Sequence, residues 1–137
     1  MPNRITHTQV YVLDQDEALD FYVGKLGLEL GTDADLGNMR WLTVTVPGRP
    51  DHEIVLASPE MGHDAETAAA IGDLVTRGAG SGLIFSVDDC RATYEELKSR
   101  DVEFTSPPTE NPYGVEAIFI DGCGNWFSLT QHTQPEK

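Results

Sequence analysis

The chain has 137 residues, a length that suits one domain with a normal hydrophobic core. Its formal net charge is −14, from 9 Lys and Arg against 23 Asp and Glu. This charge excludes nucleic acid and anionic membranes as expected partners, because both require a basic surface. The sequence has no signal-peptide pattern and no transmembrane-length apolar run, so a cytoplasmic protein is expected.

The first predicted strand, residues 5–13, has one apolar face and one polar face. His7, Gln9 and Tyr11 alternate with apolar residues such as Val10. One face is therefore expected to pack in a core. The other presents polar and aromatic groups, among which His7 is a candidate catalytic or metal-binding residue.

A helix is predicted directly after this strand. Asp14 can cap its N-terminus, and Glu17 completes a capping-box-like pattern three residues later. Ala18 and Tyr22 then recur at helical spacing, and Gly27 suits a left-handed stop.

Three further strands complete the first half of the chain. They are predicted at 28–31, 40–46 and 53–57, and turn-rich segments separate them at 33–38 and 47–51. The first half thus reads as β-α-β-β-β.

The second half repeats this order after a linker helix. The predicted elements are a helix within 64–77, a glycine-rich joint at 78–82, a strand at 83–87, a helix at 88–100, a strand at 102–105, a loop at 106–112, a strand at 115–120, a tight turn at 121–125 and a strand at 126–131. The tail from His132 is predicted to be disordered.

The two halves align with each other, with His7 falling on Gly82 and Val55 on Ser128. A repeat of this length predicts two similar units packed together, with a cleft between their sheets. We therefore expect one α+β domain over 1–137, built from paired βαβββ modules whose curved mixed sheets surround that cleft. The expected boundaries are a first module at about 4–58, a linker at about 59–81 and a second module at about 82–131.

Three motifs resemble the vicinal oxygen chelate superfamily, which contains glyoxalases, bleomycin-resistance proteins, fosfomycin-resistance enzymes and extradiol dioxygenases. They are Ile5-Thr6-His7, the A-x-x-F-Y-x-x-x-L-G pattern from Ala18 to Gly27, and the turn from Asp121 to Asn125. In that turn, Gly122 stands where the family usually has proline. The resemblance spans roughly Arg4 to Gln131 and implies paired βαβββ modules.

The resemblance also implies where a divalent metal would be held in the cleft. The family's ligand positions fall on His7, Val55, Gly82 and Ser128, and only the first of these is a normal metal ligand. Since a metal normally needs three or four protein donors, we expect no metal at these positions and no cofactor.

Two residues are candidate catalytic groups, His7 and Glu116. A carboxylate beside an imidazole raises its pKa and orients it, so the two could form an acid–base pair. The alternatives are structural: a hydrogen-bonded strand histidine, and a glutamate that is exposed or paired, for example with Arg40. The resemblance implies that Glu116 lies on the cleft side of its strand.

Several other side chains are candidate contacts to a ligand, although the aromatic ones could equally be core or interface residues. They are Gln9, Tyr11, Trp41, Tyr113, Trp126 and Ser128. His52, Glu53 and His63 are expected to be solvated residues near turns.

The resemblance implies two alternative functions for a small-molecule site. One is a glyoxalase-like enzyme of lyase or isomerase type, with an unassigned substrate. The other is a non-catalytic protein that sequesters a drug or metabolite. In either case a homodimer is expected, with the cleft within one chain or between two chains.

Overall fold

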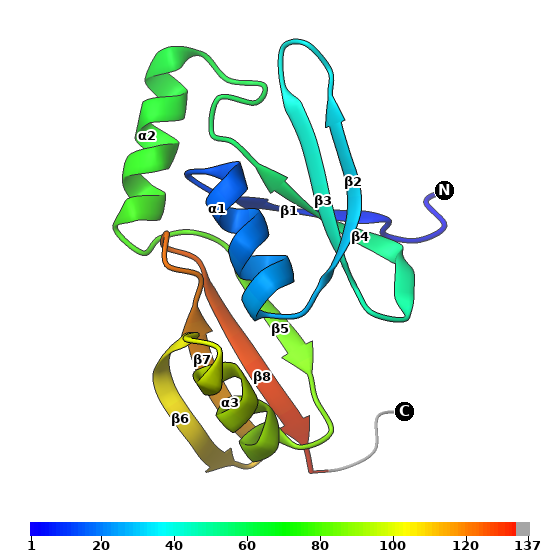
Figure 1. Cartoon of the computed structure of the whole chain (residues 1–137), viewed down its shortest axis with the longest axis vertical. Coiled ribbons are helices and arrows are strands. Elements are labelled where there is room, and N and C mark those ends of the chain that lie inside the picture. Colours follow the sequence, from blue (N-terminus) through cyan, green and yellow to red (C-terminus); the bar gives the residue numbers. More distant parts are fainter. Residues whose placement is uncertain (134–137) are drawn as a thin grey trace.

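The computed structural model describes residues 1–133. The chain forms two separate four-stranded mixed sheets with helices packed around them, which confirms the predicted α+β fold with two modules. Figure 1 shows the N-terminal sheet in the upper half of the molecule and the C-terminal sheet in the lower half, with the first helix between them. No helix among residues 1–133 is long and apolar enough to cross a membrane.

The N-terminal module contains the first four strands and the first helix. Its elements are β1 (His7–Tyr11), α1 (Gln15–Leu19), the π-helical turn η1 (Asp20–Lys25), β2 (Glu29–Asp35), β3 (Arg40–Val46) and β4 (Arg49–Ala57). The strand order is β1-β4-β3-β2, with β1 parallel to β4 and the other neighbours antiparallel.

The C-terminal module repeats this arrangement after the linker helix. Its elements, with that helix first, are α2 (Ala65–Thr76), β5 (Gly82–Ser86), α3 (Cys90–Ser99), β6 (Glu103–Asn111), β7 (Gly114–Ile120) and β8 (Trp126–His132). The strand order is β5-β8-β7-β6, and β5 is parallel to β8.

The predicted loops were too long in three places. β2 continues to Asp35, β4 begins at Arg49, and β6 runs to Asn111 through Pro107 and Pro108. β6 is an edge strand, where proline is tolerated because no neighbouring strand needs its missing N–H. Irregular registers between β6 and β7 accompany these prolines.

The predicted disordered tail was also placed too early, because His132 is the last residue of β8. The remainder of that predicted tail, residues 134–137, lies outside the described part of the chain.

The first helix begins and ends as its sequence predicts. The Asp14 side chain accepts a hydrogen bond from the Glu17 backbone N–H at 3.0 Å, and Gly27 follows the helix with φ of 84°. Between them the helix widens to π geometry, so that the Leu26 N–H donates to the Phe21 carbonyl at 2.8 Å. Phe21 and Tyr22 are both buried on the side of the helix that faces the core.

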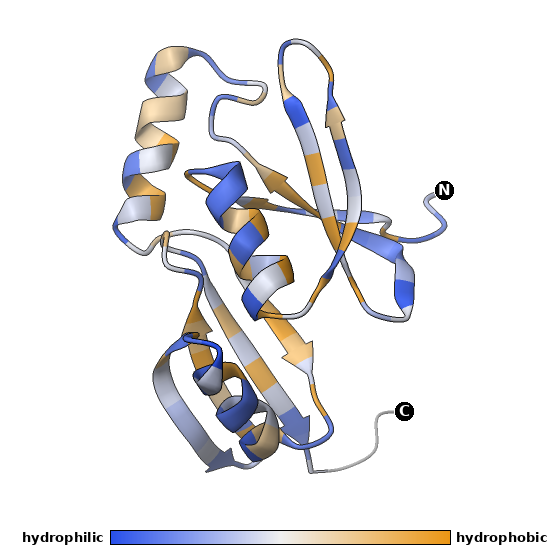
Figure 2. Cartoon of the chain, in the orientation of Figure 1, coloured by the Kyte–Doolittle hydropathy of each residue, from blue (hydrophilic) through white to orange (hydrophobic). Residues whose placement is uncertain are grey.

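A shared hydrophobic core joins the two modules. Tyr22, from the N-terminal module, packs edge-on against Phe127 of β8, with ring centroids 5.8 Å apart. Phe21 lies 6.4 Å from Phe119 of β7 by the same measure. Figure 2 shows hydrophobic residues alternating with less hydrophobic ones along β3, whose Leu42 and Val44 are fully buried in the core.

Candidate functional site

The polar face of the N-terminal sheet carries the first group of candidate residues. The parallel pairing of β1 with β4 sets His7 beside Glu53 and Gln9 beside Val55. Val10 and Val12, which point the other way, are buried in the core. The period-two alternation of the strand therefore presents His7 and Glu53 together on the side away from the core.

A carboxylate–imidazole pair lies on this face. The Nε2 atom of His7 is 3.8 Å from Oε2 of Glu53, and the His7 side chain remains 41% exposed. The Thr6 hydroxyl lies 2.8 Å from Nδ1 of the same ring. The Trp41 ring lies beside it, with centroids 6.0 Å apart. The imidazole is thus flanked by a carboxylate and an indole while staying open to a ligand.

Two threonines hold the carboxylate of Glu53 in place. Its Oε1 atom accepts a hydrogen bond from the buried hydroxyl of Thr43 and another, at 3.3 Å, from Thr32. Hydroxyl donors of this kind fix the orientation of a carboxylate while leaving it further lone pairs. Glu53 can therefore still accept a hydrogen bond from a ligand.

The polar face of the C-terminal sheet carries a second carboxylate, that of Glu116. Its Oε1 accepts a hydrogen bond from the Tyr113 hydroxyl at 2.6 Å, and its Oε2 accepts one from Ser128. The Ser128 hydroxyl also lies 2.8 Å from that of Thr130. The hydrogen bonds from Ser128 and Tyr113 hold the pKa of Glu116 below its usual value, so the carboxylate is anionic near neutral pH.

The structure divides the sequence candidates between the two sheets. The N-terminal polar face holds His7, Gln9, Tyr11 and Trp41, and the C-terminal one holds Tyr113, Glu116, Trp126 and Ser128. Within one chain His7 and Glu116 therefore do not form a pair, and each has other partners. Arg40 does not pair with Glu116 either, because its guanidinium bonds to Asp33 and Asp16.

Sequence reasoning missed Glu53, because it placed this residue and His52 near a turn. Both lie well inside β4, which begins at Arg49. The alternation of the predicted strand 53–57 places Glu53 on the same face as Val55, the position matched to the ligand set. That parity was the available signal.

The residues present do not fit the metal that the resemblance implies. The four ligand positions carry one imidazole, in His7, while Val55 and Gly82 have no side-chain donor and Ser128 is engaged by Glu116. Throughout residues 1–133, no group of three or more His, Cys, Asp or Glu side chains is arranged to hold a metal ion.

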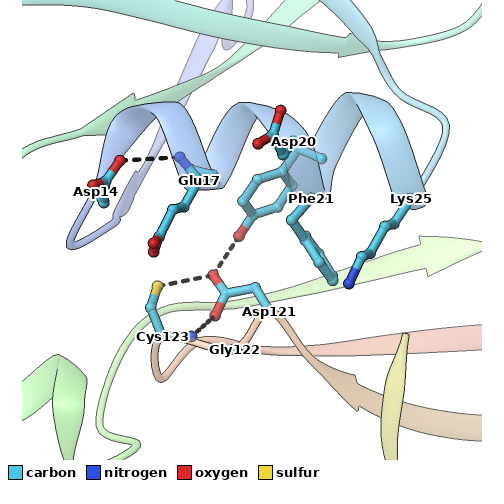
Figure 3. Close-up of a pocket in the computed structure, with 10 residues that line it drawn as sticks. Asp14, Glu17, Asp20, Phe21, Lys25, Asp121, Gly122 and Cys123 are labelled. Carbon is cyan, nitrogen blue, oxygen red and sulfur yellow. Dashed lines mark hydrogen bonds between the residues drawn. The ribbon is translucent and has the colours of Figure 1, made fainter. Parts of the chain in front are cut away.

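A pocket of about 400 Å³ lies elsewhere, where the first helix meets the turn before β8. In Figure 3, Asp121 and Cys123 of this turn point toward the helix that carries Asp14 and Glu17. The Tyr22 hydroxyl donates a hydrogen bond to Oδ2 of Asp121 at 2.6 Å. This hydrogen bond joins the first helix of the N-terminal module to the turn of the C-terminal module.

The chemistry of this junction favours an unreactive thiol. Burial, with the charge of Asp121 beside it, raises the pKa of Cys123 to about 11. The thiol is therefore protonated at neutral pH and is a weak nucleophile. Burial opposes ionisation of Asp121, yet hydrogen bonds from Tyr22 and Asn125 still hold its pKa below the ordinary value.

This junction predicts a specific dependence of stability on pH. Because the pKa of Asp121 is lower in the folded protein, its contribution is complete above the unfolded pKa of 3.8 and is lost as pH falls through the folded value. Asp121→Asn should therefore flatten the decrease in the free energy of unfolding below about pH 4, measured by urea unfolding. Asp88→Asn, at an exposed position, is the control. Equal slopes in Asp121→Asn and the wild type would contradict the prediction.

The two paired βαβββ modules, each with a four-stranded mixed sheet, define a protein of the vicinal oxygen chelate type. The model of the Glyoxalase/Bleomycin resistance protein/Dioxygenase superfamily matches residues 4–129. The chain belongs to this superfamily.

Proteins similar to this chain include an antibiotic binding protein. The crystal structure of UcmS2 is 42% identical, with a TM-score of 0.89 over 95% of this chain and 98% of that one. TnmS3, an antibiotic binding protein from Streptomyces sp. CB03234, is 30% identical, with a TM-score of 0.76 over 96% and 98% of the two chains. The uncharacterized protein YurT of Bacillus subtilis (strain 168) is 32% identical over 93% of this chain and 98% of its own length.

Proposed function

We propose that the protein binds a small, antibiotic-like organic molecule on its polar sheet faces and holds it without chemical conversion. One observation carries the proposal. The metal-ligand positions are occupied by Val55, Gly82 and Ser128, while the same faces keep two carboxylates held by hydroxyl groups. Such a surface offers hydrogen bonds and apolar contact to a ligand, as small-molecule sites do. The likeness to TnmS3 supports antibiotics as the class of ligand.

The proposal includes a homodimer, in which the N-terminal sheet of one chain faces the C-terminal sheet of a second copy. Its support is the separation of the two sheets that carry the candidate residues, since these sheets occupy different halves of the chain (Figure 1). A second support is the exposed apolar surface on the C-terminal sheet, where Ile84 is 69% and Trp126 42% exposed. Large apolar side chains gathered on one sheet face are typical of a surface covered by a partner or ligand. Sedimentation equilibrium should therefore give twice the mass of the chain.

The ligand test is a thermal-shift screen of antibiotics, followed by calorimetry on the compounds that raise the melting temperature. A compound present at about 100 times its Kd should stabilise the protein by roughly 2.7 kcal/mol. Glu53→Gln and Glu116→Gln should weaken binding, whereas Glu66→Gln, on the exposed side of α2, should not. A screen in which no compound raises the melting temperature would overturn the proposal.

Recovery of the bound compound separates holding from conversion. After prolonged incubation and denaturation, mass spectrometry should return the ligand unchanged and in stoichiometric amount. Recovery of a new product would instead favour a second candidate function, proton transfer to or from the ligand. The contact between His7 and Glu53 favours this second candidate, because an imidazole beside a carboxylate can act as a general base. His7→Ala would then abolish the conversion.

A further inference from the structure

The two modules differ at one repeated position on their parallel strand pairs. The pairing of His7 with Glu53 in the N-terminal sheet is matched by the pairing of Gly82 with Trp126 in the C-terminal sheet. In the first module this position holds an imidazole and a carboxylate. In the second it holds no side chain on β5 and a large aromatic one on β8.

The indole of Trp126 occupies the space that a side chain at residue 82 would take. A Cβ atom added to Gly82 would overlap three atoms of the indole, Cδ2, Cε2 and Cζ2. The ring therefore lies across the backbone of β5, and this arrangement requires glycine there. An aromatic ring that covers a strand while remaining 42% exposed still offers surface to a ligand.

Hydrogen-bonding groups lie next to this ring on the same face. Ser128 follows Trp126 by two residues on β8, a distance of roughly 7 Å along a strand. Its hydroxyl donates to one oxygen of Glu116, and the Tyr113 hydroxyl donates to the other. A carboxylate oxygen has a second lone pair, so Glu116 can accept another hydrogen bond from a ligand.

We infer that Gly82 and Trp126 together form a stacking platform for a planar aromatic part of the ligand, and that Glu116 receives an N–H donor attached to it. This inference rests on the proposed binding function and adds the chemical class of the ligand. The indole occupies the space of a side chain at position 82, where the family has a metal ligand. This part of the site therefore offers a surface for aromatic stacking in place of a metal ligand. Ile84, 69% exposed on the same face, extends the apolar surface beside the ring.

Three small molecules test the planar ring and the positive charge of a ligand separately, and calorimetry measures the Kd of each for the protein. 2-(1-Naphthyl)ethylamine has a planar ring and an ammonium group. 2-(Decahydro-1-naphthyl)ethylamine keeps the ammonium group without the planar ring, and 1-naphthylacetate keeps the ring with a negative charge. The first probe should bind at least about fivefold more tightly than either of the others, as expected for one stacking contact and one charge-assisted hydrogen bond.

Variants then show which residues of the protein contact the naphthyl ring and the ammonium group. Trp126→Leu should weaken the naphthyl amine roughly fivefold and leave the decahydro compound unchanged, while Trp126→Phe should retain most of the affinity. Gly82→Ala should also weaken binding of the naphthyl amine, because the added methyl group displaces the indole from β5. Glu116→Gln should reduce the ratio of the Kd of 1-naphthylacetate to the Kd of 2-(1-naphthyl)ethylamine. Trp41→Leu, which changes the tryptophan of the other sheet, is the matched control and should have the smaller effect.

Several outcomes would overturn the inference. One is equal binding of the planar and decahydro amines, or no binding of the naphthyl amine. Another is a loss of affinity that follows Trp41 in place of Trp126. Circular dichroism and melting temperature show whether Trp126→Leu is folded, and Gly82→Ala tests the same platform with the indole still present. If antibiotics from the screen bind equally well to the wild type and Trp126→Leu, the binding function stands and only the stacking platform is lost.

Discussion

Asn125→Ala should lower the free energy of unfolding by roughly 3–5 kcal/mol, because it removes a buried amide that bonds in three directions. The side-chain N–H groups of Asn125 donate to the Tyr11 carbonyl and to Asp121, both at 2.7 Å. Its side-chain oxygen accepts the Ser81 N–H at 2.8 Å. These contacts join the turn before β8 to β1 and to the end of the linker, so their loss loosens the junction of the two modules.

Urea unfolding followed by circular dichroism measures this effect. Asn38→Ala, which truncates an exposed asparagine in the loop between β2 and β3, is the control and should change stability by less than about 0.5 kcal/mol. If Asn125→Ala costs less than about 1 kcal/mol, the buried amide is not holding the modules together.

Phe119→Ala should cost about 3–5 kcal/mol, because it opens a cavity where the first helix meets the C-terminal sheet. Phe119 is fully buried. Its ring is stacked on Phe127 with centroids 5.1 Å apart and lies 5.5 Å from Phe104. Phe21 of the first helix covers the same ring, so truncation weakens the core that the modules share.

Phe119→Leu separates the loss of filled volume from the loss of ring stacking. Leucine refills much of the space, so its cost should be clearly smaller than that of alanine. Leu36→Ala, at a position 56% exposed, controls for truncation outside the core and should be close to neutral. Equal destabilisation by alanine and leucine at position 119 would show that the ring stacking, rather than the filled volume, is what matters.

The sequence predicts the core better than the candidate site. The buried face of a strand follows from local alternation, whereas the neighbours of a site residue depend on which strands pair. Alternation in β1 correctly separates the buried Val10 and Val12 from His7, Gln9 and Tyr11, since strand periodicity is a local property. Which acid stands beside His7 depends on the pairing of β1 with β4, whose residues are 46 positions apart in the sequence. That pairing selects Glu53 as the neighbour, while Glu116 lies on the other sheet.

Local patterns in the sequence were enough to predict the repeat of two βαβββ modules, the first-helix cap at Asp14 and its stop at Gly27, and the superfamily of the chain. These features depend on short-range periodicity, capping and turn chemistry, which each segment carries locally. Three features follow only from the folded chain: Glu53 lies beside His7, hydroxyl groups donate to Glu116, and the indole of Trp126 fills the place of a side chain at Gly82. Each of these depends on strand register and on the direction of long side chains, which pairing and packing between distant segments fix.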